Sequence, residues 1–198
     1  VFADIGSHWC DLVEWVSDER FTEVSAAFDT VIAERGTDTG QSFSTPTGDS
    51  PMQAVTSEDV AAALFRTDAG TLAALTVSQV SAGRRNRLWF EIDGANASVA
   101  FNQEDAERLW IGLPDQREEI FVRGPGAGSA EQRRLSVLPA GHAQGYAQCF
   151  EAFVADTYLA INGERPQGLP TFEDGLRSAQ IVDRVIASAR SRAWTAIG

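Results

Sequence analysis

Residues 60–81 read VAAALFRTDAGTLAALTVSQVS, and this stretch decides the class of fold. Two runs of apolar and β-branched residues, 60–67 and 71–81, enclose the short turn Asp68-Ala69-Gly70. Runs of this length and composition on either side of a glycine-containing turn are typical of a β-hairpin. The stretch therefore predicts two neighbouring antiparallel strands.

The same pattern continues along the chain. Residues 87–93 and 97–102 enclose Gly94-Ala95-Asn96, which predicts a second hairpin. Two further short strands are predicted over 109–112 and 118–123. Hairpins in succession favour an antiparallel or mostly antiparallel sheet over alternating strand–helix units.

Helices are predicted on both sides of this block of strands. Apolar residues at helical spacing indicate one helix over 7–17 and two in the last third of the chain. Residues 21–33 alternate as in a long strand, and residues 36–56 are rich in Gly, Ser, Thr, Asp and Pro, as in a loop. The three predicted apolar stripes are Trp9, Leu12, Val13 and Val16; Tyr146, Cys149, Phe150, Phe153, Thr157 and Ile161; and Phe172, Leu176, Ala179, Val182, Ile186 and Ala189.

These elements predict an α+β fold over residues 1–198 as a single domain. We expect a large, mostly antiparallel mixed sheet with its helices packed on one face. The other face has no predicted helix to cover it. A large, partly apolar face of this kind favours a partner subunit, so we expect a homodimer or a higher homo-oligomer.

The charge of the chain excludes two classes of partner. Its 28 acidic and 16 basic residues give a net charge of −12, which disfavours a nucleic-acid or anionic membrane surface. No apolar run is long enough to span a membrane. All basic residues are Arg, so no lysine is available as a general acid or Schiff-base nucleophile.

Two cysteines, Cys10 and Cys149, lie far apart in the sequence inside apolar helical patterns. Reduced, buried thiols are typical of the cytoplasm, whereas a disulfide is typical of an oxidising compartment. We therefore predict two free thiols in a cytoplasmic protein.

Asp4 and His8 are the strongest candidates for catalysis. They are four residues apart at the start of the first predicted helix, where side chains at this spacing lie on one face. A carboxylate that fixes the tautomer of an imidazole makes it a competent proton acceptor, which the oxidation of an alcohol needs. The spacing alone is also compatible with Asp4 capping the helix and His8 packing beside it.

Other polar and aromatic residues are candidates for substrate binding. His142 lies in a loop flanked by glycines shortly before Tyr146, where side chains often face a cleft, although a role at the helix start is an equal alternative. Gln79, Arg84 and Asn86 follow a predicted strand and could bind sugar hydroxyls or solubilise its edge. Three tryptophans could stack on a sugar ring or belong to a core or an interface, namely Trp15, Trp89 and Trp110.

Five segments in order resemble the Gfo/Idh/MocA family of oxidoreductases. The first, Asp4-Ile5-Gly6-Ser7-His8-Trp9-Cys10-Asp11, is similar to the Asp-x-Gly-x-His-x-x-Asp signature that opens the active-site helix of the family. The others are residues 78–88, similar to its central strand; 90–94, similar to its Glu-Ile-x-Gly hairpin; 141–146, similar to its Gly-His-x-x-Gly-aromatic helix start; and 170–175, similar to the start of its last helix.

The resemblance implies the C-terminal, substrate-binding and dimerising half of an NAD- or NADP-dependent sugar or polyol dehydrogenase, such as one acting on inositol. In that family an N-terminal Rossmann domain binds the dinucleotide and supplies a lysine, usually within Glu-Lys-Pro. Asp4 and His8 would be the catalytic pair, with His142, Tyr146, Gln79, Arg84 and Asn86 near the substrate. The full-length parent would use NAD or NADP, whereas this chain would bind no cofactor and be inactive by itself.

The sequence carries no dinucleotide-binding motif, as expected for a chain without the Rossmann domain. The sequence contains no G-x-G-x-x-G between a strand and a helix, and Gly124-Pro125-Gly126-Ala127-Gly128 is interrupted by proline. A metal site built on Asp4, His8 and His142 would need a further close ligand, and we predict none. Two alternatives stay open: a dimerisation or carbohydrate-binding module without turnover, and a cofactor-free hydrolase or isomerase that uses His8 and Asp4.

Overall fold

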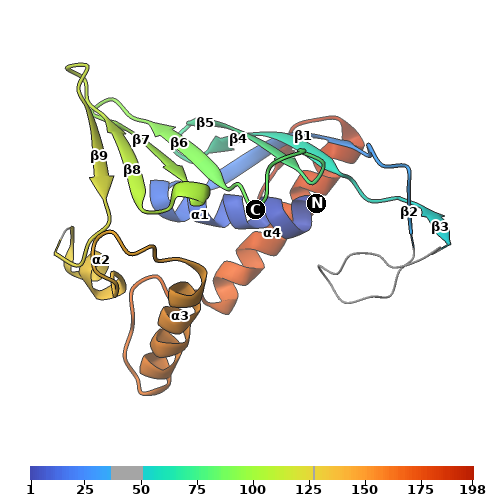
Figure 1. Cartoon of the computed structure of the whole chain (residues 1–198). Helices are drawn as coiled ribbons and strands as arrows, with labels where there is room; N and C mark the ends of the chain where they lie inside the picture. The colour runs from blue at the N-terminus through green and yellow to red at the C-terminus, as the bar shows by residue number, and fades with distance from the viewer. Residues whose placement is uncertain (37–50, 127) are drawn as a thin grey trace. The chain divides into compact units, whose positions relative to one another are not determined.

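The computed structural model describes residues 1–36, 51–126 and 128–198. The chain forms two compact units (Figure 1). The first unit comprises Val1–Gly83 and Glu173–Gly198, and the second comprises Arg84–Phe172. Residues 37–50, which make up most of the predicted loop 36–56, lie outside the described residues.

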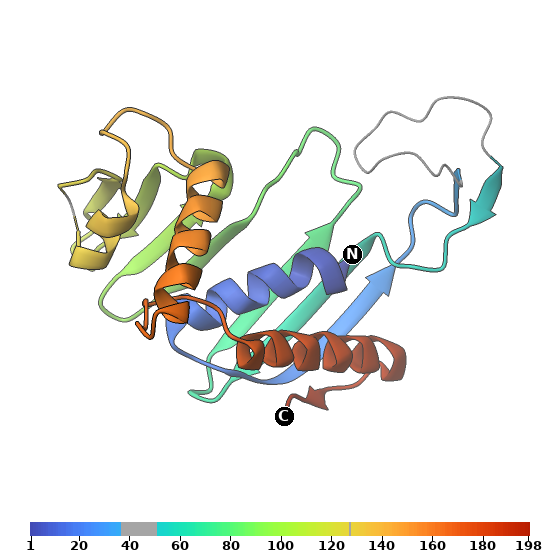
Figure 2. The ribbon, with the colours of Figure 1, turned by 90° about the horizontal axis from the view of Figure 1, so that it is seen from below.

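The first unit is a four-stranded antiparallel sheet with two helices on one face. Its strands run in the order β10 (Thr195–Ala196), β1 (Phe21–Asp29), β4 (Val60–Thr67) and β5 (Leu72–Ser78). The helices α1 (Ser7–Ser17) and α4 (Phe172–Ser191) lie across the same face of the sheet, as Figure 2 shows. A two-stranded ribbon, β2 (Glu34–Gly36) and β3 (Met52–Ala54), stands at the edges of the predicted loop.

The core of this unit lies between the sheet and the two helices. Phe21 stacks on Phe65 with 4.4 Å between ring centroids, and both rings are buried. Alternate residues of β4 face the helices, so its burial alternates strictly from Ala61 onwards, as a half-buried strand requires. The opposite face stays open and carries Ala62, Leu64, Ala74 and Thr76.

The second unit is built on a meander. The strands β6 (Trp89–Asp93), β7 (Ser98–Asn102), β8 (Arg108–Gly112) and β9 (Glu118–Val122) pair in sequence order, with a single 3-10 turn, η2 (Gln103–Asp105), between β7 and β8. The short helix α2 (Ala130–Leu135) and the helix α3 (Tyr146–Ile161) follow. Arg134 of α2 donates to both carboxylate oxygens of the buried Asp156 on α3, which joins the two helices.

The predicted α+β class is confirmed, and all strand pairings among the described residues are antiparallel. The strands do not form the one large sheet that the sequence predicted. The strands divide into two four-stranded sheets and the ribbon, because residues 79–88 between β5 and β6 form no strand that would pair the two sheets. The helix α2 had no counterpart in the predicted elements.

The predicted burial of the helices needs correction. The face of α4 that meets the sheet carries Ile181, Val185 and Ser188, whereas the predicted Phe172 and Leu176 are exposed. The predicted apolar stripe of α3 is likewise mostly exposed, Cys149 included. Cys10 is buried, and burial raises the pKa of its thiol. Neither cysteine is in a disulfide.

None of the helices within the described ranges combines the length and apolar character needed to cross a lipid bilayer.

Candidate active site

The Asp4–His8 segment starts with a turn of π-helix. Residues Phe2–Gly6 form this turn, η1, and the backbone N–H of Ser7 donates to the carbonyl of Phe2 five residues back. α1 follows without a break, so Asp4 lies in the π-helical turn and His8 in the first α-helical turn. Single π-helical turns are rare and occur frequently at functional sites.

Gly6 makes this turn possible. A Cβ atom at position 6 would lie 2.6 Å from the Phe2 ring, far inside carbon–carbon contact distance. Phe2 is fully buried, so its ring cannot turn out into solvent without exposing apolar surface. The ring therefore packs directly against the backbone at Gly6 and fixes the start of α1. This contact gives a physical reason for the glycine in the Asp-x-Gly-x-His motif.

Ser7 completes the local framework. Its hydroxyl donates to the carbonyl oxygens of Ala3 and Asp4, each at 3.0 Å. The backbone on which the Asp4 side chain stands is thereby tied to α1. The sequence analysis assigned roles only to Asp4 and His8. The structural roles of Gly6 and Ser7 were missed, because they depend on contacts with Phe2, Ala3 and Asp4 that the motif does not reveal.

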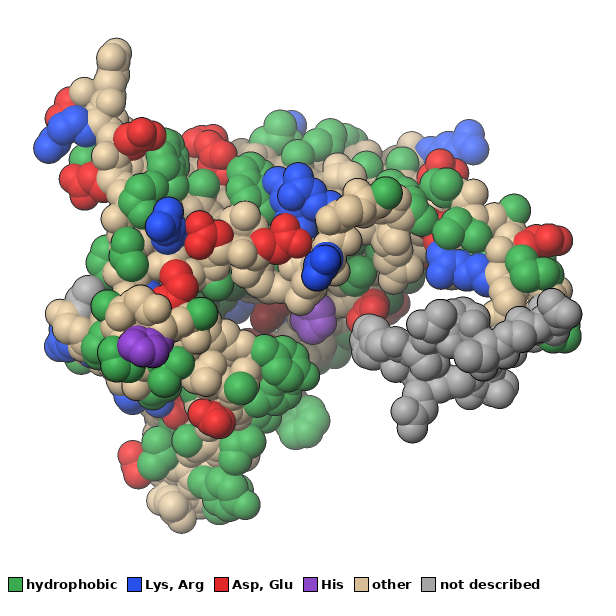
Figure 3. All heavy atoms as spheres, in the orientation of Figure 1, with side chains coloured by type: hydrophobic (Ala, Val, Ile, Leu, Met, Phe, Trp, Pro, Cys, Tyr) green, Lys and Arg blue, Asp and Glu red, His purple; other side chains and the backbone are tan. Residues whose placement is uncertain are grey.

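Asp4 and His8 are both exposed, and the surface view shows the chain's two histidines in purple (Figure 3). Within residues 1–36, 51–126 and 128–198, no hydrogen bond or ion pair joins the Asp4 carboxylate to the His8 imidazole. Both side chains stand on the exposed surface of the helix start, four residues apart in the sequence.

Asp11, the last residue of the motif, has a raised pKa. Partial burial is the largest cause, and the carboxylates of Asp174 and Glu14 raise it further, while His8 and Arg20 act in the opposite direction. The charged form of Asp11 is therefore less favourable in the folded protein than in the unfolded chain.

Glu14 anchors α1 from the other side. This buried carboxylate accepts from the backbone N–H of Phe21 at 2.6 Å and from Arg177 of α4 at 2.7 Å. Arg20 adds a contact of 3.0 Å. One carboxylate thus joins α1, β1 and α4. Glu14 lies among the buried residues of α1, beside Cys10 and Val13. A carboxylate at such a position in the sequence predicts a buried charge with a partner, and this signal could have identified Glu14.

The remaining site residues fall in three places. In the first unit, Gln79 is exposed just beyond β5, where its backbone N–H donates to the carbonyl of Asp59. In the second unit, Arg84 and Asn86 share an exposed loop that is held by Glu104, 3.7 Å from the Arg84 guanidinium. The structure therefore brings Arg84 and Asn86 together.

His142 and Tyr146 flank the start of α3, and both are exposed. The loop that carries His142 is fixed by Arg123, which donates to the His142 carbonyl at 2.8 Å and forms an ion pair of 2.9 Å with Glu107. Glu107 also accepts from the backbone N–H of Gln144. These hydrogen bonds, from Arg123 first, lower the pKa of Glu107. Sequence reasoning missed this framework because its members are distant along the chain.

No group of three His, Cys, Asp or Glu side chains in the described part of the chain is arranged to hold a metal ion. The sequence lacks the glycine-rich strand–turn–helix, and the strands of the described ranges form no parallel pair.

Residues 1–100 match the GFO/IDH/MocA C-terminal domain, and the chain belongs to this family of domains. The predicted resemblance is confirmed.

Comparison with individual proteins gives a consistent result. The chain is 29% identical to levoglucosan dehydrogenase of Pseudarthrobacter phenanthrenivorans over 96% of its own length and 50% of the relative. An oxidoreductase domain protein from Kribbella flavida superposes with a TM-score of 0.83 at 27% identity, over 100% of this chain and 51% of that one. A levoglucosan dehydrogenase solved with NADH and L-sorbose gives 0.82 at 25% identity, over 98% and 50%. The chain thus spans about half the length of these relatives.

Proposed function

We propose that this chain is the substrate-binding and catalytic-helix half of an NAD- or NADP-dependent sugar or polyol dehydrogenase. One observation carries the proposal: a carboxylate and an imidazole stand exposed on a rigidly built helix start, in a chain that matches half of a sugar dehydrogenase along almost its whole length. Levoglucosan and L-sorbose, ligands of the related dehydrogenase, indicate the class of substrate. Residues 1–198 would work with a separate dinucleotide-binding half, in the cytoplasm.

In this proposal His8 accepts the proton of the substrate hydroxyl. A neutral imidazole is a suitable proton acceptor near neutral pH, and its exposure at the start of α1 allows a hydroxyl to reach it. Asp4 orients the substrate and the imidazole and stabilises the imidazolium that forms. The dinucleotide, bound to the Rossmann half, would accept the hydride from the carbon that carries this hydroxyl.

The other polar residues bind the remaining hydroxyls of the substrate. Gln79, Arg84, Asn86, His142 and Tyr146 all present exposed side chains, and all except Tyr146 carry side-chain N–H donors that suit sugar oxygens. The Arg123–Glu107 pair acts through the backbone and holds the His142 loop in place.

We also propose that the open face of the β1–β4–β5 sheet joins two copies of the chain. Ala62, Leu64, Ala74 and Thr76 give this face small and mainly apolar side chains, which suit self-association. Introducing a charge with Leu64→Glu should convert a dimer into a monomer in light scattering. A wild-type protein that is already monomeric would contradict this part of the proposal.

The decisive experiment measures reduction of NAD⁺ and NADP⁺ by the full-length protein with levoglucosan, L-sorbose and myo-inositol. His8→Ala should lower kcat about 10²–10⁴-fold while KM for the dinucleotide stays within about twofold. Asp183→Asn, which removes an exposed carboxylate of α4 on the helix side of the sheet, serves as the matched control and should leave kcat unchanged. Residues 1–198 alone should reduce neither dinucleotide.

Three outcomes would argue for other functions. Turnover of a substrate without any dinucleotide would favour a hydrolase or isomerase. Sugar binding without turnover in the full-length protein would favour a binding module. Unchanged turnover in His8→Ala would remove His8 from the mechanism.

A further inference from the structure

A hollow of about 440 Å³ lies between the β6–β7 and β8–β9 turns, wholly within the second unit. Its volume falls within the range of about 300–1,000 Å³ that is typical of small-molecule sites. None of its lining residues belongs to the Asp4–His8 motif. Its aromatic and polar residues are Ser98, Trp110, Gln116, Arg117 and Glu118.

The indole of Trp110 is fixed in its orientation. Its Nε1 donates to Oε2 of Glu118 at 2.9 Å. A Cβ atom at Gly112 would lie 2.5 Å from the ring, so the indole packs against the strand where a side chain is missing. Gly112 also pairs across the strands with Glu118. One acceptor and one glycine thus hold a large, flat aromatic ring at the edge of the hollow.

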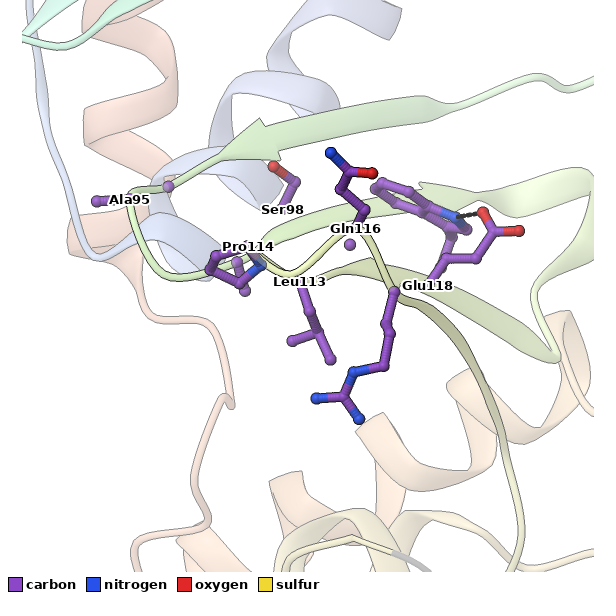
Figure 4. Close-up of a pocket in the computed structure, with 11 residues that line it drawn as sticks. Ala95, Ser98, Leu113, Pro114, Gln116 and Glu118 are labelled. Carbon is purple, nitrogen blue, oxygen red and sulfur yellow. Dashed lines mark hydrogen bonds between the residues drawn. The ribbon is translucent and has the colours of Figure 1, made fainter.

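Gln116 occupies a backbone conformation that favours glycine. Its φ is +65°, and it lies in the turn where the Leu113 N–H donates to the Arg117 carbonyl and the Gln116 N–H donates to the Leu113 carbonyl. A glycine would adopt this conformation without strain. The chain instead carries an amide here, and Figure 4 shows the side chains of Gln116, Ser98 and Glu118 directed to the same side of the hairpin. Non-glycine residues are uncommon in this region, and here the turn places an amide side chain at the hollow.

The charges of the hollow select a neutral ligand. Arg117, the only cation among the described residues that line it, is paired with Asp115. Glu118 adds a negative charge, and the whole chain carries −12. A phosphate or carboxylate group would meet no uncompensated positive charge among these lining residues, whereas hydroxyl groups can donate to Glu118 and exchange hydrogen bonds with Gln116 and Ser98.

We propose that this hollow binds a neutral sugar ring. The C–H groups of the ring, which carry partial positive charge, stack on the electron-rich face of Trp110. The Glu118 carboxylate and the Gln116 amide bind its hydroxyls, and Ser98 adds a third contact. Placed aromatic surface with a few oriented polar groups is the usual composition of a small-ligand site. This assignment does not depend on the proposed dehydrogenase activity, since it uses none of its residues.

Trp89 provides a matched control on the same sheet. It faces the same side as Trp110, because Trp89 pairs with Asn102 and Ala100 pairs with Trp110. The Arg87 guanidinium lies 5.7 Å from the centre of the Trp89 ring and covers it. Trp89 does not line the hollow. A sugar that recognises the hollow should therefore perturb Trp110 and leave Trp89 unchanged.

The test uses protein labelled with 5-fluorotryptophan, whose five ¹⁹F resonances are assigned from single Trp→Phe variants. D-glucose, added without dinucleotide, should shift the Trp110 resonance along a saturating curve with a dissociation constant on the order of 1 mM. Glucose 6-phosphate should bind at least about threefold more weakly. A linear, non-saturating shift, an equal shift of Trp89, or tighter binding of the phosphate ester would overturn the proposal.

Gln116→Gly separates binding from folding. It relieves the turn conformation, so the variant should melt at a higher temperature than wild type, yet it removes the amide and should weaken glucose binding about tenfold. Ala95→Ser, a change on the rim without a proposed hydrogen bond, should leave the affinity within about twofold. Unchanged glucose affinity in a stabilised Gln116→Gly protein would show that the turn is strained for another reason and would refute this site.

Discussion

Replacing Gly6 by alanine tests the construction of the candidate active site most directly. The new Cβ would lie 2.6, 2.8 and 2.9 Å from three carbons of the Phe2 ring, where about 3.5–4.0 Å is favourable. Overpacking of a buried ring costs about 1–3 kcal/mol, and the intrinsic helix preference of alanine over glycine returns about 0.5–1 kcal/mol. We therefore expect Gly6→Ala to lower the free energy of unfolding by about 1–2 kcal/mol.

Urea denaturation of the single and double variants measures this contact. Phe2→Leu removes the ring edge that meets position 6, so Gly6→Ala combined with Phe2→Leu should be more stable than the sum of the two single effects by about 1 kcal/mol. Gly175→Ala in α4 is the matched control, since a Cβ there meets nothing within 4 Å, and it should stabilise the protein. Strictly additive effects of Gly6→Ala and Phe2→Leu would refute the reasoning. In the full-length protein, Gly6→Ala should lower kcat and the double variant should recover part of it.

Three further changes test the interactions around α1 and α4. Glu14→Ala removes the buried carboxylate that pairs with the half-buried Arg177 and should cost about 3–5 kcal/mol in chemical denaturation, while Glu14→Gln should cost less; equal effects would show that the charge is unimportant. Asp11→Asn should raise the melting temperature at pH 7 and leave it unchanged at pH 3. The raised pKa of Asp11 means that the folded state holds the proton more tightly, so wild-type stability falls as pH rises through that range, and a Tm difference independent of pH would contradict this. Ser188→Ala removes the hydroxyl that accepts from the Ala26 N–H at 3.0 Å and donates to the Ala193 carbonyl, and should cost about 1–3 kcal/mol of unfolding free energy; a neutral change would indicate that water replaces it.

The strands and the first helix could be predicted closely from local sequence. Residues 60–67 and 7–17 form β4 and α1 with the predicted bounds. Turn residues and period-two alternation act over a few neighbours, so the sequence carries their signal directly. The motif that contains Asp4 and His8 is also contiguous, which is why its pattern could be found in the sequence alone.

The burial of α3 and α4 could not be predicted in the same way. Both helices carry apolar residues on more than one side, and periodicity cannot choose between two apolar stripes. In α4 the choice follows from fixed polar partners: Arg177 reaches Glu14, and the Ser188 hydroxyl bonds to β1. Those partners are more than 160 residues away in the sequence.

The amino-acid sequence by itself determined the α+β class, most strand positions and the family, and it located the motif that contains Asp4 and His8, because each depends on residues close together in the chain. Tertiary structure alone decided that Phe2 packs on Gly6, that Glu14 joins three elements, and that Trp110, Gln116 and Glu118 border one hollow. The physical reason is that these contacts form between side chains whose proximity depends on strand register and helix rotation. Register and rotation are set by the packing of the whole unit.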